Sequence, residues 1–417
     1  MTDHSTDHST DHSTDHMPGR ARSRRLIHLS AAVLSLTYGL AAAQDTAHAE
    51  KTAHAEKTAH ADRTVHTEAA ARPGNSIQES LDRLVRSDGF PAALASVRGR
   101  DGRVRDYTAG VADLRTRAKA PVDGYVRIGS NTKTFTAVVV LQLAGEGRVR
   151  LDEPIETYLP GLVRGGGGDG RRITVRQLLQ HTSGLPDYTA FLAEDPLSHR
   201  NTYMQPRELL DMALKEKARF RPGAKWEYSN TNYLVAGLLI EKVTRRPLAE
   251  QIDQRIVRRL GLRHTYLPDA GDRSVRAPHP KGYHRDEPDE PLTDVTRWDP
   301  SQAWAAGGMI STPRDVNRFF GAVLGGELLE PEQLREMRTT VRADGLGKGA
   351  RYGLGLISTP LSCGGLAWGH GGDIFGYHTG NAVTEDGRAA AVAVTRLPGS
   401  LEALGHVDKA VDAALCS

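Results

Sequence analysis

The sequence predicts an α/β domain that is interrupted by a helical one. Two strand-like segments, 92–97 and 104–109, stand near the start of the folded part, and further strand-like segments follow residue 350. Between these groups the apolar residues recur at helical spacing. Strands at both ends of a chain with helices between them indicate one sheet built from distant segments. We expect an α/β domain from 76–150 and 301–417, and a helical domain from 151–300.

The first 75 residues differ in composition from the rest of the chain. Residues 1–43 hold a Thr-Asp-His-Ser repeat, a basic segment that begins at Met17 and an apolar run, so we interpret them as a repeat tail and a signal peptide. A retained membrane anchor is the alternative, and Met17 is an alternative start. Cleavage is expected near Ala43 or Ala49, which predicts a secreted protein with no stable membrane span afterwards. Residues 44–75 are expected to be a disordered spacer, because they contain almost no large apolar residue.

Composition excludes several classes of protein. With 39% hydrophobic and 25% charged residues, the chain is typical of a soluble globular protein. The net charge is only +3 and the arginines are scattered, so no nucleic-acid partner is expected. No cofactor or metal is expected either, because the histidines of the repeats imply no fixed ligand geometry. Cys363 and Cys416 are the only cysteines; in an exported protein we expect them to form a disulfide, with two buried thiols as the alternative.

The first folded segment is expected to run helix, strand, strand, helix. Apolar residues at helical spacing predict an amphipathic helix over 77–86, and a turn at 100–103 joins the two strands. After Gly129, an apolar run from Phe135 to Leu143 predicts a helix that is buried on most sides.

The remaining elements follow from the same patterns. Helices are expected over 174–180, 206–217 and 231–244, and a surface loop over 269–300. Thr312 and Pro313 suit the N-cap and the first position of another helix. The C-terminal part is expected to hold four strands and a closing helix, at 352–357, 366–370, 377–383, 389–395 and 401–415.

Ser130 and Lys133 are the first candidate catalytic residues. They stand three positions apart at the start of the buried helix, so the hydroxyl and the amine can touch. A lysine in a dry pocket has a lowered pKa and can take the proton of a serine. The free N–H groups of a helix N-terminus suit a developing oxyanion. A surface serine with a solvated lysine is the alternative, since the motif is short.

Tyr228 and Asn230 lie just before the helix expected at 231–244, where a loop can present side chains to a cleft. A tyrosine can act as a proton shuttle when a nearby ammonium lowers its pKa, and an asparagine can orient a substrate amide. A half-buried hydrophobic anchor is the alternative for Tyr228.

The chain resembles the penicillin-recognising serine hydrolases in three motifs and their order. These motifs are Ser130-x-x-Lys133, Tyr228-Ser-Asn230 and His370-Gly-Gly372. It is most similar to the secreted D-alanyl-D-alanine carboxypeptidases that share a fold with class C β-lactamases. The resemblance runs from about Ile77 to the C-terminus and includes the His181-Thr-Ser-Gly-Leu segment. It implies a β-lactamase/transpeptidase-like fold, with an antiparallel sheet flanked by helices and an inserted helical domain.

The resemblance also implies roles. Ser130 would be the acylated nucleophile, Lys133 would activate it, Tyr228 would shuttle the proton and Asn230 would bind the substrate amide. His370 would be the fourth catalytic residue. The remaining predicted substrate-binding residues are Trp304, Gly371, Gly372 and Asp373, with the backbone N–H groups of Ser130 and Asp373 as the oxyanion hole. A core tryptophan is the alternative for Trp304.

The implied activity is that of an exported D-alanyl-D-alanine carboxypeptidase, acting through an acyl-enzyme on peptidoglycan stem peptides and binding β-lactams. Two departures point elsewhere: the family's hydroxyl residues after the histidine are replaced by Gly371 and Asp373, and no basic residue stands near Ile357. A D-aminopeptidase, a D-amino-acid amidase or an esterase of the same family is therefore the alternative. A non-catalytic penicillin-binding sensor is the alternative from another class.

Overall fold

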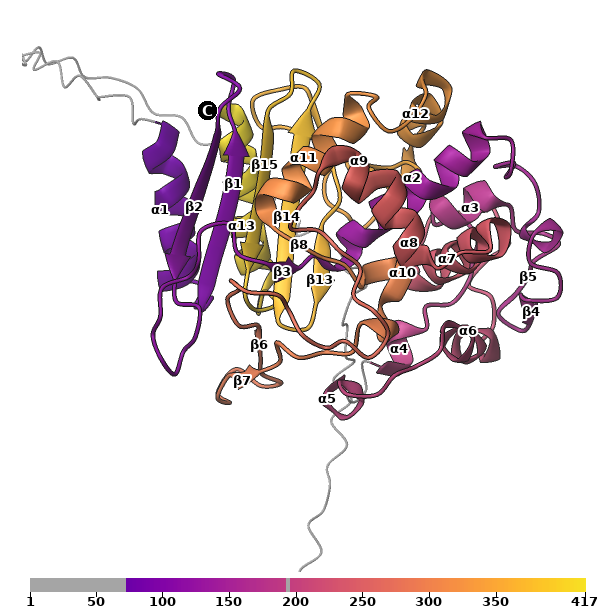
Figure 1. The fold of residues 1–417 in the computed structure, drawn as a ribbon, viewed down its shortest axis with the longest axis horizontal. Helices are drawn as coiled ribbons and strands as arrows, with labels where there is room; N and C mark the ends of the chain where they lie inside the picture. Colours follow the sequence, from indigo (N-terminus) through magenta and orange to yellow (C-terminus); the bar gives the residue numbers. More distant parts are fainter. Residues whose placement is uncertain (1–72, 193–195) are drawn as a thin grey trace, which may run out of the picture. The chain divides into compact units, whose positions relative to one another are not determined.

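The structure, a computed structural model, describes residues 73–192 and 196–417 (Figure 1). The predictions for the repeat tail, the signal peptide and most of the spacer concern residues outside these ranges. Among the helices of the described residues, none combines the length and the hydrophobicity that a membrane span needs.

One antiparallel sheet of nine strands organises the described residues, in the order β2-β1-β15-β14-β12-β11-β10-β9, with β13 also pairing with β14. The two N-terminal strands therefore join strands that lie more than two hundred positions later, as the sequence pattern predicts. Ala93 pairs with Val394 across this junction. The strands of the sheet are β1 (Ala92–Arg98), β2 (Val104–Gly110), β9 (Val341–Arg342), β10 (Arg351–Tyr352), β11 (Ile357–Pro360), β12 (Leu366–Gly369), β13 (Gly372–Ile374), β14 (Tyr377–Thr384) and β15 (Ala389–Val394).

Strand β15 shows why this part of the sheet is apolar on both sides. All six of its residues are buried, and successive side chains point to opposite faces. Ala390, Val392 and Val394 belong to the hydrophobic cluster formed with α1 and α13, whereas the alternate residues Ala389 and Ala391 belong to the main core. Helices cover both faces, so the strand has no polar alternation.

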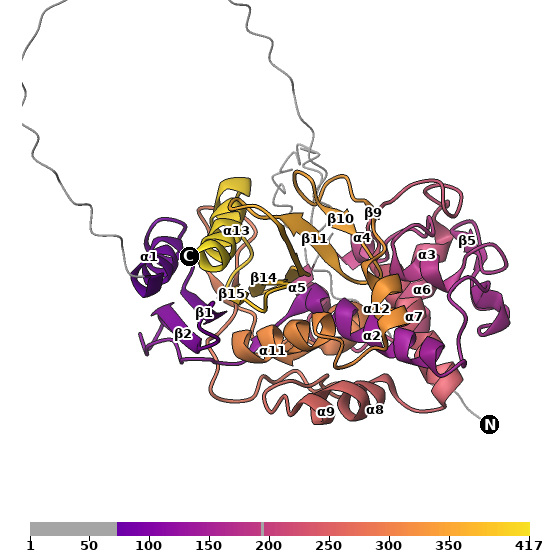
Figure 2. The same cartoon turned by 90° about the horizontal axis from the view of Figure 1, so that it is seen from above.

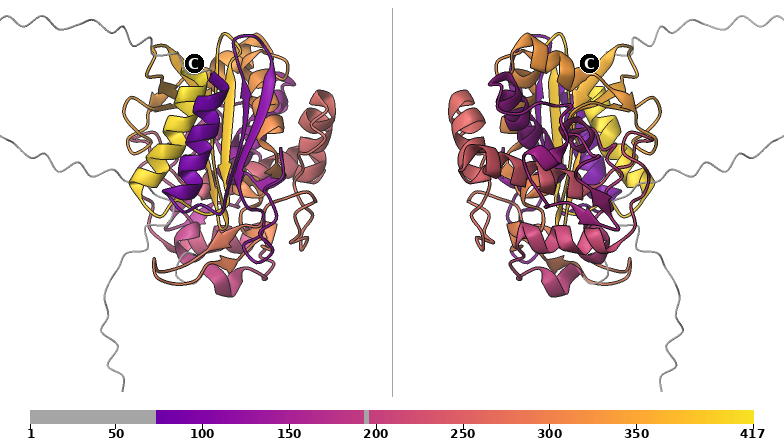
Figure 3. Two further views of the ribbon diagram at one scale, coloured as in Figure 1. Left: turned by 90° about the vertical axis from the view of Figure 1, so that its left-hand side faces the viewer. Right: turned by 90° about the vertical axis from the view of Figure 1, so that its right-hand side faces the viewer.

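Helices α1 (Pro73–Arg86) and α13 (Leu401–Cys416) lie side by side on one face of the sheet, as Figure 3 shows. Helices α2 (Thr132–Gly145) and α11 (Pro313–Leu324) lie on the other face, which is clearest from above in Figure 2. The other α-helices are α3 (Val175–Leu179), α4 (Thr189–Leu192), α5 (Pro196–His199), α6 (Pro206–Lys215), α7 (Asn230–Thr244), α8 (Leu248–Ile252), α9 (Arg258–Leu260), α10 (Trp304–Gly307) and α12 (Pro331–Arg338).

The helical prediction for 151–300 is incomplete. Among the described residues, three two-stranded ladders lie outside the main sheet; two of them fall within 151–300, one of these in the expected surface loop. The main hydrophobic core runs from α2 through α7 to α11, so the predicted α/β and helical segments share it. We keep the division into two domains as a proposal. The small strands are β3 (Val126–Arg127) with β8 (Ile310–Ser311), β4 (Arg164–Gly165) with β5 (Gly168–Asp169), and β6 (Tyr283–His284) with β7 (Thr293–Asp294).

Two local predictions at the ends of helices are confirmed. Thr312 caps α11 by accepting a hydrogen bond from the backbone N–H of Asp315, and Pro313 takes the first helical position. Cys363 and Cys416 form a disulfide that joins the β11–β12 turn to the end of α13. The disulfide is consistent with an extracellular protein.

Candidate active site

Ser130 lies in a short 3₁₀ turn (Gly129–Asn131) that leads directly into α2. The buried helix thus begins at Thr132, two residues later than the motif predicts. The 3₁₀ turn nevertheless keeps the two side chains on one side, and Lys133 Nζ lies 2.9 Å from Ser130 Oγ. The predicted contact between hydroxyl and amine is present.

Lys133 is completely buried and holds two further short contacts, both 2.7 Å long, to Asn230 Oδ1 and to the carbonyl of Ala306. Burial lowers the pKa of Lys133 to about 7, although the negative charges of Asp187 and Asp373 oppose the shift. A large part of the lysine is therefore a neutral amine at neutral pH, which is the form that can accept a proton.

Tyr228 closes the other side of Ser130. Its phenol is in hydrogen-bonding contact with the Ser130 side chain, and Lys133 Nζ lies 4.9 Å from the centre of its ring. Burial raises the pKa of Tyr228 well above its ordinary value, and this outweighs the contact with Ser130, which lowers it. The sequence-based expectation of a lowered pKa is therefore not met. At neutral pH Tyr228 holds its proton and can donate it.

Asn230 is the first residue of α7, and both ends of its amide are engaged. Its Oδ1 accepts from Lys133, while its Nδ2 donates to Asp187 Oδ2 at 2.9 Å. Asp187 therefore sets the orientation of the amide. In this arrangement Asn230 holds Lys133 rather than presenting a free amide to a substrate.

His370 lies directly after β12 and is only 3% exposed. Its Nδ1 is 2.6 Å from the carbonyl of Gly371, which can only accept, so Nδ1 carries the proton and Nε2 accepts from the Tyr352 hydroxyl at 2.9 Å. Burial, together with the charge of Lys133, lowers the pKa of His370 to about 3. His370 is thus a neutral imidazole with both nitrogens engaged, and its ring centre lies 6.3 Å from that of Tyr228.

Two glycines let β13 lie against the Ser130 turn. A Cβ on Gly129, which has a φ of +48°, would come within 2.7–2.9 Å of three backbone atoms of Asp373. A Cβ on Gly372 would come within 2.0 Å of the carbonyl oxygen of Ile128. Only residues without side chains fit here, and the close approach brings the backbone of Asp373 beside Ser130, as the predicted oxyanion hole requires.

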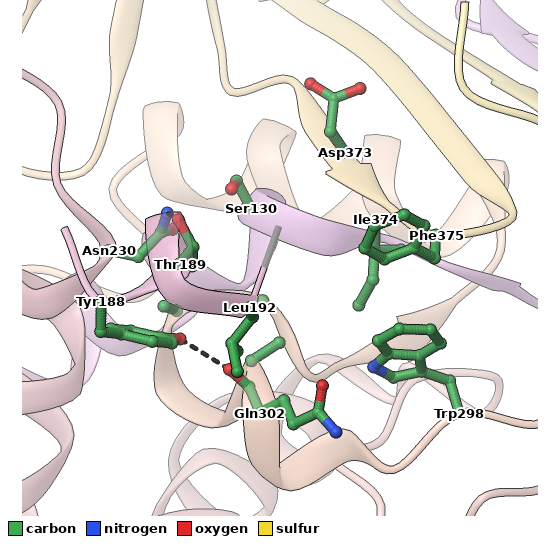
Figure 4. A pocket seen from close by; sticks show the side chains of 13 residues that line it. Ser130, Tyr188, Thr189, Leu192, Asn230, Trp298, Gln302, Asp373, Ile374 and Phe375 are labelled. Carbon is green, nitrogen blue, oxygen red and sulfur yellow. Dashed lines mark hydrogen bonds between the residues drawn. The ribbon is translucent and has the colours of Figure 1, made fainter. Parts of the chain in front are cut away.

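A mostly apolar pocket opens beside Ser130 (Figure 4). Trp298 and Phe375 form part of its wall and stack with ring centres 4.8 Å apart. Figure 4 places Ser130 between these rings and Asn230, with the carboxylate of Asp373 pointing away from Trp298. The remaining lining residues are Tyr188, Thr189, Leu192, Gln302, Ala303, Ala306, Gly307 and Ile374.

Trp304 is not among the residues that line this pocket. Its ring packs against Gly237 of α7, where an added Cβ would come within 2.7 Å of it, and it borders a separate pocket. Trp298 is the tryptophan at the site, and sequence reasoning missed it. The segment that carries it was expected to be a surface loop, and its position depends on buried Arg127, whose guanidinium donates to the carbonyls of Trp298 and Thr296.

Asp373 forms an ion pair with His378, its partner across the β13–β14 ladder, with 2.6 Å between Oδ1 and Nδ1. Burial lowers the pKa of His378, but the charge and the hydrogen bond of Asp373 together raise it by more, so the net shift is upward. The structure thus brings Ser130, Lys133, Tyr228, Asn230 and Asp373 together, with His370, Gly371 and Gly372 behind them.

Comparison with known proteins assigns this architecture. The sequence profile of the beta-lactamase family matches residues 77–415. Among solved structures, a D-stereospecific amidohydrolase from Streptomyces sp. is 41% identical, with a TM-score of 0.75 over 81% of this chain and 98% of that one. The D-amino acid amidase from Ochrobactrum anthropi SV3, solved with L-phenylalanine amide, is 29% identical, with a TM-score of 0.73 over 82% and 97%.

Curated relatives are more distant. Protein flp of Staphylococcus aureus (strain N315) is 28% identical over 206 residues, which cover 48% of this chain and 40% of that protein. The putative penicillin-binding protein PbpX of Bacillus subtilis (strain 168) is 24% identical over 68% of this chain and 65% of that protein. The chain thus spans less than half of the staphylococcal relative. The profile match covers most of the described residues, and the chain belongs to the beta-lactamase family of serine hydrolases.

Proposed function

We propose that this serine hydrolase cleaves amides and peptides of D-amino acids that carry a free amino group and a large apolar side chain, as a D-amino-acid amidase or D-aminopeptidase. The charge around Ser130 carries the proposal. None of the residues that line the pocket is basic, and one of the lining residues, Asp373, carries a carboxylate. A second carboxylate, Asp187, contacts Asn230. The charges of both carboxylates oppose the lowering of the Lys133 pKa by burial, so they act on the reacting centre.

The charge arrangement supports a cationic substrate over an anionic one. A free α-ammonium is attracted to a carboxylate in a partly desolvated pocket, whereas a C-terminal carboxylate is repelled. His378 offsets part of the charge of Asp373, but Asp187 has no arginine or lysine partner among its hydrogen bonds to Asn230 and Thr189. The two carboxylates therefore support recognition of an amine at this site.

The apolar pocket supports a large side chain. Trp298, Phe375 and Leu192 offer a stacked aromatic pair and an aliphatic surface beside the nucleophile. Burying a phenylalanine-sized side chain there contributes about 1.5–3 kcal/mol. Two solved relatives of this chain, a D-stereospecific amidohydrolase and a D-amino acid amidase, carry names that fit the same substrate class.

The geometry supports acyl transfer in two steps. Neutral Lys133 takes the proton of Ser130, whose oxygen attacks the substrate carbonyl, and the backbone N–H groups of Ser130 and Asp373 stabilise the oxyanion. The phenol of Tyr228 gives its proton to the leaving amine and recovers one from protonated Lys133, which took it from Ser130 in the first step. Water then attacks the acyl-enzyme by the reverse proton path and releases the D-amino acid.

A D-alanyl-D-alanine carboxypeptidase, which the resemblance implies first, would need a basic or hydroxyl group for the terminal carboxylate. Gly371 and Asp373 supply neither. Ile357 lies in β11, where a basic residue is expected nearby in a carboxypeptidase, and none of the pocket-lining residues is basic. We therefore place peptidoglycan stem peptides below D-amino-acid amides as substrates. β-lactams remain expected acylating ligands, and we propose that the chain is exported, which the disulfide supports.

Hydrolysis of matched substrates tests the proposal. D-phenylalanine amide, its N-acetyl derivative, L-phenylalanine amide and a D-Ala-D-Ala peptide are compared by kcat/KM on the same preparation. The proposal expects D-phenylalanine amide to be best by about tenfold or more over each of the others. A D-Ala-D-Ala peptide that is hydrolysed better than the amide would overturn it. A protein that is labelled by a fluorescent penicillin at Ser130 but hydrolyses none of them would be the non-catalytic sensor.

A further inference from the structure

His181 occupies a backbone conformation that normally selects another residue. It follows Gln180, the C-cap of α3, and has a φ of +59°, in the left-handed region. Glycine and asparagine take this conformation with the least strain, so a histidine here is disfavoured by its own backbone. The imidazole is completely buried. Its contacts must therefore account for its presence.

All of the polar contacts of the ring point to one acceptor atom. Nδ1 lies 3.2 Å from the backbone nitrogen of Ser229 and 3.0 Å from Nδ2 of Asn232. Because a backbone N–H can only donate, Nδ1 accepts and the proton of the neutral ring is on Nε2. Ser183 donates to the other end of the Asn232 amide, which fixes its Nδ2 as a donor toward His181.

The same ring lies against Tyr228. The two rings stack with their centres 4.3 Å apart and their planes 30° apart. The carbonyl of His181 also accepts from the backbone N–H of Glu227 at 3.0 Å. One residue thus holds three consecutive positions: the backbone of Glu227, the ring of Tyr228 and the backbone of Ser229.

We propose that His181 is a positioning residue for proton transfer: its Nδ1 anchors the Tyr228-Ser229-Asn230 segment, and its ring holds the phenol of Tyr228 against Ser130. The proposal rests on the function proposed above, in which Tyr228 protonates the leaving group. Without the anchor, the segment can shift while Ser130, in the 3₁₀ turn, and Lys133, in α2, stay in place. Attack on the carbonyl then continues, but departure of a poor leaving group slows.

A comparison of leaving groups separates this role from a structural one. An amine must be protonated as it leaves, whereas p-nitrophenolate leaves without a proton. His181→Asn keeps an acceptor near the position of Nδ1 and tolerates the left-handed backbone, but it loses the ring. His181→Phe keeps a ring and loses the acceptor. Each variant is assayed on D-phenylalanine amide and on the p-nitrophenyl ester of D-phenylalanine, with Tm recorded.

Both variants should lose about a hundredfold or more in kcat on the amide and less than about tenfold on the ester, with small changes in KM. Asn317→Ala, which removes a buried hydrogen bond from α11 to the Ser96 carbonyl of β1, is the matched control: it should lower Tm and leave the amide-to-ester ratio unchanged. If either folded variant loses the same factor on both substrates, or loses nothing on both, the proposal is overturned.

The outcome is distinguishable from failure of the proposed function. A wild-type enzyme that cleaves the ester but not the D-amino-acid amide contradicts the proposed substrate class. The comparison is then made with benzylpenicillin, whose unconjugated ring nitrogen also needs a proton as the amide bond opens. A selective loss of benzylpenicillin acylation in the His181 variants would still support the positioning role, and an equal loss would overturn it.

Discussion

Lys133 Nζ lies 2.7 Å from Asn230 Oδ1, although 97 positions separate the two residues in the sequence. Asn230 Oδ1 accepts one hydrogen bond from the lysine, and the carbonyl of Ala306 accepts a second. A neutral amine has two N–H bonds and one lone pair. Because the third contact is Ser130 Oγ at 2.9 Å, the lone pair of the neutral amine faces the serine hydroxyl. The two acceptors therefore turn the lone pair of a neutral Lys133 toward the serine, as its proposed role as a base requires.

The rate of Ser130 acylation should rise with pH through about 7, because burial lowers the pKa of Lys133 to about 7 and only the neutral amine accepts a proton. Below that pH the ammonium predominates, and the rate should fall about tenfold per pH unit. A fluorophosphonate, which does not titrate near neutral pH, is a suitable probe for this measurement. A rate that stays constant from about pH 5 to 8 would show that neutral Lys133 is not the base.

How far the sequence predicts this site depends on whether a contact is local. The contact between Ser130 and Lys133 follows from a spacing of three residues on one helical turn, and it is present. The paired strands at the two ends of the chain also follow from their pattern. The tautomer of His370 and the raised pKa of Tyr228 depend on burial by distant segments, which a local pattern does not contain.

The pocket wall illustrates the same limit. Trp298 and Trp304 stand six positions apart in a segment whose sequence has no periodic apolar pattern, so nothing local tells which ring faces the cleft. The carbonyl contacts of buried Arg127 hold the backbone of Trp298, while Trp304 packs on Gly237. The selection is made by long-range packing.

Gly371→Ala and Gly372→Ala should differ sharply although the two positions are adjacent. A Cβ on Gly372 would lie 2.0 Å from the carbonyl oxygen of Ile128, so β13 must move away from the Ser130 turn. A Cβ on Gly371 meets only the carbonyl oxygen of Thr379, at 3.5 Å. We expect Gly372→Ala to lose about a hundredfold or more in acylation rate, as when an oxyanion donor is removed. Gly371→Ala should stay within about tenfold of wild type. Equal rates for the two variants would contradict this account of the strand.

Replacing both cysteines by serine should lower stability and leave the site intact. The disulfide closes a loop with a sequence separation of 53 residues, for which chain entropy allows about 4 kcal/mol as an upper value. Urea unfolding should therefore show a loss of up to about 4 kcal/mol, while kcat/KM under native conditions stays unchanged. Thiol titration of denatured, unreduced wild type should find no free thiol; two free thiols would show that the bond does not form.

Trp298→Leu should change side-chain preference, because Trp298 and Phe375 form the stacked wall of the pocket. The ratio of kcat/KM for D-phenylalanine amide to that for D-alanine amide should fall by about tenfold or more, since about 1.5–3 kcal/mol of side-chain burial is at stake. Use of a ratio cancels any loss of folded enzyme. Trp304→Leu is the matched control, and its ratio should equal that of wild type. If Trp304→Leu changes this ratio more than Trp298→Leu does, Trp304 determines the side-chain preference.

Asp373→Asn should weaken the preference for a free amine. The carboxylate lines the pocket beside Ser130, and its hydrogen bond to His378 can be kept by an asparagine oxygen, so the change removes mainly charge. We expect the kcat/KM ratio of D-phenylalanine amide to its N-acetyl derivative to fall about tenfold, because a charged hydrogen bond contributes about 1.5–3 kcal/mol. Activity on a D-Ala-D-Ala peptide should rise at the same time, since a like charge is removed from the leaving end. Asp344→Asn, at an exposed residue paired with Arg342, changes the net charge equally and should alter neither the ratio nor the activity on the D-Ala-D-Ala peptide. If Asp373→Asn leaves both quantities unchanged, the amine is recognised elsewhere, and Asp187 beside Asn230 becomes the next residue to replace.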